Sequence, residues 1–256
     1  IAEGKAMVAA AREHKRVVQT GSQQRSDAKF RQACELVRNG AIGKITEVKV
    51  GLPGPNFSGP AVPDSDPPAV LDYDLWLGPA PERKYNAKHV HYLFRFFWDY
   101  SGGQQTNFGA HHLDITQWAL GMDESGPTSI EPSEVVFNDK KWFETPEVAK
   151  IKYTYANGVV VNCGLGKGAP PQGCTFVGEK GTIYVTRGKL EASDPEILKF
   201  AGGDVKLYAS KGHHADWLEC IKTRKSPICD VAIGHRSATV CHLGNIAVRT
   251  GKKFTW

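Results

Sequence analysis

The sequence predicts an α+β fold, in which helices cover a large and mostly antiparallel sheet. Strand-like segments crowd the middle of the 256-residue chain, at residues 133–137, 149–155, 159–163, 175–177 and 182–186. Asn157-Gly158 and the stretch at 178–181 are tight-turn signals between these segments, and consecutive hairpins give antiparallel pairing. Helical patterns flank the strand-rich region on both sides.

The chain opens with a helix and a short strand. Residues 2–14 are rich in alanine, and residues 16–20 form a β-branched stretch that Gly21 ends. Such a pair is one unit of a parallel α/β sheet, and we expect it to be the last one because the pattern then changes. Asp27 caps a second predicted helix that runs to residue 39, and residues 45–50 alternate like a half-exposed strand.

The segment at 51–72 is predicted to be a long irregular loop, because it is rich in Pro, Gly, Asp and Ser. Long loops in compact domains are often functional. A further helix follows the glycine pair at 102–103 and stops at Gly121, and two more cover residues 215–223 and 235–249.

Composition argues against several classes of protein. The net charge is +5, but basic and acidic residues are interleaved, so binding to nucleic acid or to a membrane surface gains no support. No apolar run approaches the ~18–20 residues of a membrane span. The six scattered cysteines form no zinc-binding pattern, so we expect free thiols, no metal site and a reducing compartment such as the cytoplasm. The start at Ile1 without Met suggests a piece of a longer protein, whose export stays open.

The helix after the glycine pair carries the strongest candidate site. Asn107, His111 and Asp114 are spaced by four and three residues, which places them on one helix face. A histidine and two short polar groups beside glycines suit proton transfer. The alternative is a polar face satisfied by its neighbours. We predict a site role for His111 and a structural role for His112, which points about 100° away.

Other residues could contribute to the same site. Arg95 could bind sugar hydroxyls or a carboxylate, and the rings of Trp98 and Tyr100 suit a carbohydrate face, although aromatic residues here could equally be core. Gln23, Gln24 and Arg25 follow the first strand at its C-terminal end, where α/β sheets bind ligands; a surface loop is the alternative.

Two other motifs invite a functional interpretation that we reject. Residues 164–169 match Gly-x-Gly-x-x-Ala, but two prolines follow, so no helix can begin there to hold a pyrophosphate and a glycine-rich turn is expected. His213, His214 and Asp216 could suggest a metal, but adjacent histidines point apart, and we expect Asp216 to cap a helix instead.

Read together, these motifs resemble the Gfo/Idh/MocA oxidoreductases, the family of glucose–fructose oxidoreductase and inositol dehydrogenase. The resemblance runs along essentially the whole chain, at residues 2–8, 21–25, 76–79, 98–121, 178–182 and 234–237. It implies that residues 1–25 are the last helix–strand unit of an N-terminal Rossmann domain. Residues 26–256 would form the C-terminal domain for substrate binding and oligomerisation. The implied protein is a homo-oligomer joined through its sheet.

The resemblance also implies roles for individual residues. The family motif Gly-Gly…Asp-x-x-x-His-x-x-Asp maps onto Asn107, His111 and Asp114, which makes His111 the general acid/base of an NAD- or NADP-dependent dehydrogenase of sugar or cyclitol hydroxyls. Residues 23–25 would contact the cofactor, and Asp114, Arg95, Trp98 and Tyr100 the substrate.

This sequence departs from the family pattern in two ways. Asn107 stands where the family has Asp, and an amide cannot accept a proton. The Gly-x-Gly-x-x-Gly loop and the Glu-Lys-Pro motif are missing, so we expect the chain alone to bind no NAD(P) productively and to be inactive. Two alternatives therefore stay open. One is an NAD-dependent glycoside hydrolase of the same family, favoured by the aromatic run and the 51–72 loop. The other is a non-catalytic sugar-binding or oligomerisation module.

Overall fold

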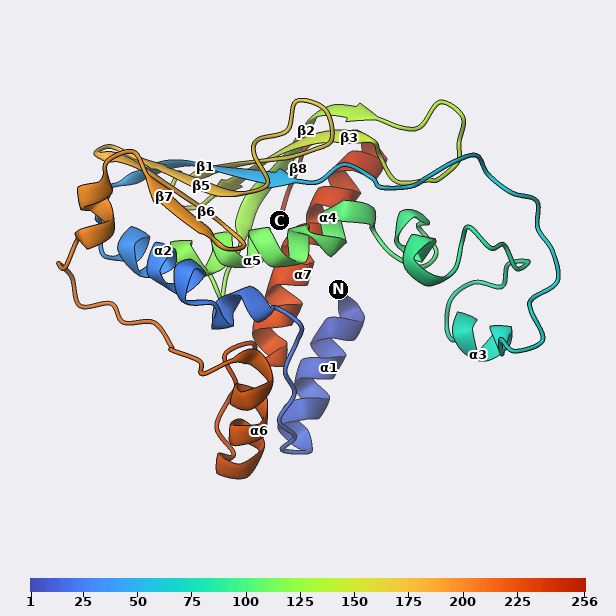
Figure 1. The fold of residues 1–256 in the computed structure, drawn as a ribbon, viewed down its shortest axis with the longest axis horizontal. Helices are drawn as coiled ribbons and strands as arrows, with labels where there is room; N and C mark the ends of the chain where they lie inside the picture. The colour runs from blue at the N-terminus through green and yellow to red at the C-terminus, as the bar shows by residue number, and fades with distance from the viewer.

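The computed structural model describes all residues, 1–256, and is built on one eight-stranded sheet (Figure 1). The strand order is β7-β6-β5-β1-β4-β3-β2-β8, and every neighbouring pair is antiparallel except β1 with β4. The strands are β1 (Ile45–Leu52), β2 (Pro127–Val136), β3 (Val148–Tyr155), β4 (Val160–Leu165), β5 (Gly173–Gly178), β6 (Gly181–Thr186), β7 (Lys189–Ala192) and β8 (Phe254–Thr255). The predicted, mostly antiparallel sheet and both hairpins are confirmed.

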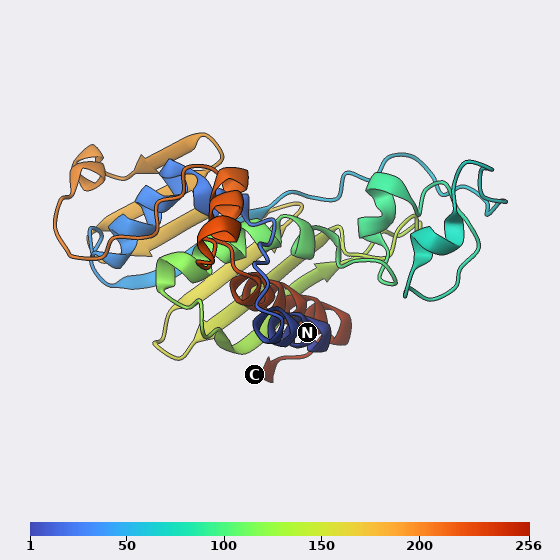
Figure 2. The ribbon, with the colours of Figure 1, turned by 90° about the horizontal axis from the view of Figure 1, so that it is seen from below.

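Three helices lie side by side on one face of the sheet (Figures 1 and 2). α2 (Ala28–Arg38) covers β6 and β7, α5 (Gly109–Leu120) covers β1 and β5, and α7 (Val231–Thr250) covers β2 and β3. α1 (Ala2–Glu13) packs on α7, outside this layer. The remaining short elements are η1 (Gln23–Ser26), α3 (Tyr73–Leu77), η2 (His91–Phe96), α4 (Gly103–Asn107), η3 (Pro195–Lys199) and α6 (His213–Thr223).

Strand alternation explains why the helices sit on one face only. Val48, Val50 and Val161 point into the core with less than 1% of their surface exposed, whereas Lys49 and Lys152 are exposed on the opposite face. Lys49 and Lys152 both flank Asn162 in the register, so the open face carries a polar row. No helix covers this face (Figure 1).

Two parts of the fold differ from expectation. The strand expected at 16–20 is wrong: only Gln19 forms a bridge, to Asp230, because no strand of the chain runs alongside this segment. The loop after β1 extends far from the sheet and carries α3 and η2 (Figure 1). It is anchored by a small separate core in which Phe57 packs against Phe96, Phe97 and Phe143.

Candidate functional site

The predicted helix after the glycine pair is confirmed, with one irregularity. α4 and α5 follow each other through Phe108, whose carbonyl accepts bonds from the backbone N–H groups of His111 and His112, both at 3.0 Å. Gly121 ends α5 in a left-handed conformation, with φ of 70°. Gly103 also has a positive φ, 64°, and a Cβ there would lie 2.9 Å from the side chain of Thr145. The glycine pair therefore serves protein packing.

His111 lies half-buried on the surface of α5, beside the β6–β7 turn. Its ring meets that of Phe108 edge-on, and the guanidinium of Arg187 lies 5.2 Å from the centre of the Phe108 ring. When the Gln24 amide is oriented so that both of its polar atoms are satisfied, it bridges the two elements, donating to the His111 carbonyl at 3.1 Å and accepting from Nε of Arg187 at 3.2 Å. No sequence pattern singled out Arg187, because only the folded hairpin brings it here.

The electrostatics of this location favour a neutral His111 ring. Burial lowers the pKa of His111, the charge of Arg187 lowers it further, and the charge of Asp114 only partly opposes them. Nδ1 of His111 is buried and has no hydrogen-bond partner. Because Nδ1 is enclosed by protein, Nε2 is the ring nitrogen that can exchange a proton with a bound group.

Asn107 belongs to a different set of contacts. Its Nδ2 donates to Oε1 of Gln104 at 2.9 Å, and Nε2 of Gln104 donates to the carbonyl of Gly54 at 3.1 Å. These amides tie α4 to the loop after β1. No hydrogen bond joins Asn107 to His111, although helix spacing stacks the two residues on one face.

Asp114 forms part of a buried ion-pair network. It is 0% exposed and accepts bonds from Nε and Nη2 of Arg25, at 2.9 and 2.8 Å, and from Oγ of Ser237 at 2.6 Å. Arg25, 1% exposed, also donates to both oxygens of Asp123, at 2.7 and 3.0 Å. Burial lowers the pKa of Arg25, but the two carboxylates outweigh it and hold that pKa above its usual value. We therefore correct the ligand-binding roles expected for Asp114 and Arg25, because their bonding groups are occupied inside the protein.

His112 has the structural role that its position predicts. It is fully buried, and its Nδ1 lies 3.0 Å from the carbonyl oxygen of Gly51 in β1. Burial lowers its pKa to about 4, so the ring is neutral at pH 7 and donates its Nδ1 proton to that carbonyl.

The three predicted substrate residues before the glycine pair lie apart from His111. Arg95 folds back on Tyr92, with its guanidinium 3.7 Å from the ring centre. Trp98 and Tyr100 line a hollow of about 510 Å³ that is bounded on the other side by α7. The guanidinium of Arg249 stacks on Trp98 there, 4.9 Å from the ring centre, and neither Asn107 nor His111 lines this hollow.

The residues of this chain do not fit a complete dinucleotide site. Among the three expected cofactor residues, only Gln23 is exposed, since Gln24 and Arg25 are buried. The glycine-rich segment after β4 is a turn, as predicted: Gly166 and Gly168 have φ of 76° and 75°, and no helix follows them. No helix N-terminus therefore faces a pyrophosphate there.

The His213–Asp216 cluster is not a metal site, and no group of three or more His, Cys, Asp or Glu side chains in the molecule could hold a metal ion. Asp216 does not cap α6 as expected, because Gly212 is the capping residue. Its carboxylate instead accepts bonds from Tyr208 at 2.6 Å and the backbone of Ile228 at 2.9 Å. All six cysteines are free and buried, as predicted. None of the helices has the length and apolar character needed to cross a bilayer.

Comparisons with known proteins agree with this fold. Solved structures share it at low identity. The WlbA dehydrogenase from Bordetella pertussis, in complex with NADH and UDP-GlcNAcA, is 18% identical with a TM-score of 0.66, over 99% of this chain and 68% of that one. The aldose-aldose oxidoreductase from Caulobacter crescentus, complexed with glycerol, is 19% identical with a TM-score of 0.65, over 100% and 68%. GenD2 from gentamicin A biosynthesis, in complex with NAD, is 14% identical with a TM-score of 0.62, over 99% and 67%.

This chain thus spans about two thirds of the length of these proteins. A comparison with curated protein sequences found no match. The family model for the C-terminal alpha/beta domain of the Gfo/Idh/MocA oxidoreductases matches residues 55–256. The chain therefore belongs to the Gfo/Idh/MocA oxidoreductase family.

Proposed function

We propose that this chain is the substrate half of an NAD(P)-dependent dehydrogenase that acts on a hydroxyl group of a sugar or cyclitol. His111 is the general acid/base in this proposal. The observation that carries it is the half-buried His111 ring, which has a lowered pKa and no hydrogen bond to a protein group. NAD(P), when bound, would accept the hydride. Relatives of the same fold that were solved with NADH or NAD support a cofactor of this type.

The residues around His111 suit the removal of a hydroxyl proton. A neutral imidazole accepts the proton as the carbonyl product forms, and its lowered pKa lets it lose the proton again near pH 7. Arg187 supplies a positive charge nearby, which would stabilise negative charge on the substrate oxygen. Asn107 cannot accept a proton, but its carboxamide oxygen could receive a hydrogen bond from a neighbouring hydroxyl group.

The proposal also assigns the two parts of the chain. Residues 1–25 would be the last helix–strand unit of the cofactor domain, and residues 26–256 the substrate domain. The family match supports the assignment of residues 55–256 to the substrate domain. We further propose that two copies associate through the polar, helix-free face of the sheet, on which Lys49 and Lys152 lie.

The test is turnover of a panel of sugars and cyclitols with NAD and NADP, by the protein expressed from its complete gene. His111→Ala should lower kcat by about 10²-fold, because a positioned general base contributes that much or more. The matched control is His14→Ala, since His14 is an exposed histidine at the end of α1 and should be dispensable.

Three results would overturn parts of the proposal. Unchanged kcat in His111→Ala would remove this residue from the mechanism. Release of sugar from glycosides with no net NADH would identify the NAD-dependent glycosidase instead. Absence of both activities would leave the non-catalytic module.

A further inference from the structure

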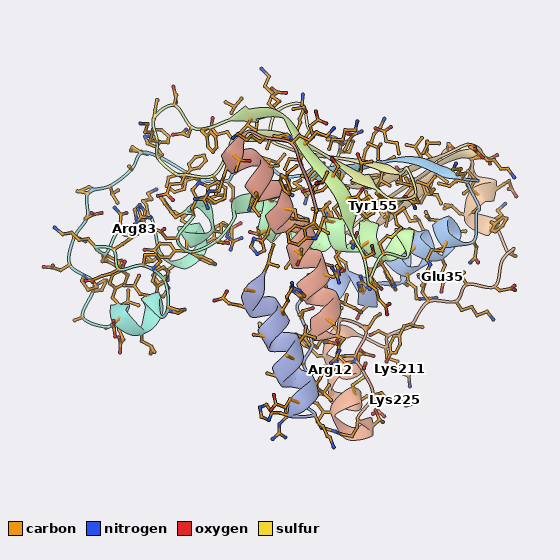
Figure 3. The ribbon with its side chains drawn as sticks, turned by 180° about the vertical axis from the view of Figure 1, so that it is seen from behind. Arg12, Glu35, Arg83, Tyr155, Lys211 and Lys225 are labelled. Carbon is orange, nitrogen blue, oxygen red and sulfur yellow. The ribbon has the colours of Figure 1, made fainter.

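A basic hollow lies between the C-terminal ends of α1 and α6, at the end of these helices that points away from the sheet (Figure 3). Its volume is about 550 Å³. Figure 3 shows Arg12 and Lys225 close together at this end, far from Arg83 in the segment after β1. The hollow shares no lining residue with the surroundings of His111.

The charge of this hollow is strongly one-sided. Five cationic side chains and a single carboxylate line it, namely Arg12, Lys15, Arg16, Arg224, Lys225 and Asp230. The local excess is therefore four positive charges, in a chain whose total net charge is +5. Charges gathered within one hollow lie within about a Debye length, ~8 Å at physiological salt, and repel one another.

Two of the five cations have structural partners. Arg12 forms a bidentate pair with Asp230, which also caps α7 through the backbone N–H of Ala232. Arg224 donates to the carbonyl of Lys15 and so ties the end of α6 to the end of α1. These contacts neutralise the only carboxylate, satisfy a helix-end carbonyl and fix the shape of the hollow.

The other three cations follow the C-terminal ends of α1 and α6, where positive charge complements the helix dipoles, but they have no carboxylate partners. Lys15, Arg16 and Lys225 are exposed, and none has a carboxylate within 4.0 Å. Lys15 is moreover held in the left-handed region, with φ of 50°, as is Arg224 with φ of 61°. Both residues stand just past the end of a helix, where a left-handed residue commonly closes the last turn. The fold thus holds unpaired positive charges around a concave surface.

We propose that this hollow binds the phosphate group of a small phosphate monoester. A phosphate carries close to two negative charges at pH 7 and has several acceptor oxygens, which match the unpaired lysines and the flat guanidinium of Arg16. A volume of about 550 Å³ accommodates the phosphate together with an organic group. The site is independent of the function proposed for His111.

Calorimetry on the protein expressed from its complete gene, with NAD added to fill the cofactor site, tests this proposal, and the probes are AMP, inorganic phosphate and adenosine. AMP and phosphate should bind, and adenosine, which lacks the phosphate, should not. The triple variant Lys15→Gln, Arg16→Gln and Lys225→Gln should weaken AMP binding by about tenfold or more, because each exposed charge contributes a modest share. It leaves the structural contacts of Arg12 and Arg224 in place.

The control removes three positive charges elsewhere, by Lys84→Gln, Lys140→Gln and Lys141→Gln on exposed residues in and beside the segment after β1. It should change AMP affinity less than twofold. Equal weakening by both triple variants would show general charge attraction and overturn the proposal, as would no binding of AMP or phosphate at 10 millimolar. Tighter binding of AMP than of phosphate supports an ester as the ligand, whereas equal binding supports the free ion as its source.

Discussion

Successive turns of the same helical surface have opposite surroundings. Asn107 and His111 lie on the part that remains partly open, and Nδ1 of His111 has no partner. Asp114, less than one turn further on, is completely buried and accepts three strong hydrogen bonds from protein groups. Residue spacing alone makes the three residues equivalent, but only Asn107 and His111 lie where a ligand could reach them.

The difference comes from what crosses the helix at each turn. η1 packs over α5 and delivers Arg25, and α7 delivers Ser237 to the same carboxylate. Beside His111, η1 contributes only the Gln24 amide, which contacts the backbone carbonyl, and the β6–β7 turn contributes the exposed Arg187, so the ring itself stays free of hydrogen bonds. Polar groups that are satisfied inside the protein stabilise it, and those that are left unsatisfied are available for chemistry.

The largest expected effect concerns Asp114, on the buried part of the helix. Asp114→Asn should lower the free energy of unfolding by about 3–5 kcal/mol, because it leaves the buried Arg25 with one carboxylate in place of two. Urea denaturation measures this loss.

Asp123→Asn is the control for this variant, because it removes the other partner of Arg25. The Asp123 side chain is 31% exposed, so its loss should cost about 1 kcal/mol or less. Equal costs for the two variants would show that burial does not distinguish the carboxylates.

The next effect is a pH dependence from His112. Its folded-state pKa of about 4 lies below its usual value of about 6.5, so the unfolded chain takes up the proton first as the pH falls. The stability contribution of the neutral ring is complete above pH 6.5 and is lost between pH 6.5 and 4, by about 3 kcal/mol in total.

His112→Asn removes the titrating ring but keeps a donor for the Gly51 carbonyl. The free energy of unfolding, measured between pH 7 and 4.5, should therefore decrease less steeply with falling pH in this variant than in the original protein. Parallel curves would contradict the assignment of this acid sensitivity to His112.

The smallest effect concerns His111, on the partly exposed part of the helix. Arg187→Gln should raise the pKa of His111, because it removes a positive charge that disfavours protonation of the ring. NMR titration of the His111 ring protons measures this shift. Lys189→Gln removes a charge next to the same turn, but the Lys189 side chain is exposed and does not contribute to the shift of His111, so this variant should leave the titration curve in place. A shift of equal size in both variants would mean that His111 senses the general field of the turn.

Sequence patterns predict the parts of this molecule that depend on local residues. The hairpin at Asn157-Gly158, the cap at Asp27 and the stop at Gly121 each follow from the conformational preference of one or two residues. The structural role of His112 follows from its angle around the helix. The burial and pairing of Asp114 do not follow from local residues, because its partners Arg25 and Ser237 lie 89 and 123 residues away in the sequence. Arg187 escaped prediction for the same reason.

The single parallel pair in the sheet has a consequence for synthesis on the ribosome. β1 is the first strand of this pair and β4 is the second. In the pair, Val160 of β4 lies about 110 residues after its partner, Glu47 of β1. Parallel strands require such a crossover, and long-range pairing slows folding. At ~5–20 residues per second, β1 emerges roughly 6–20 seconds before β4 exists. Until then its valines lack their β4 neighbours, and α5, the helix that covers β1, also lies later in the chain, so this apolar stretch is exposed while the chain is being made.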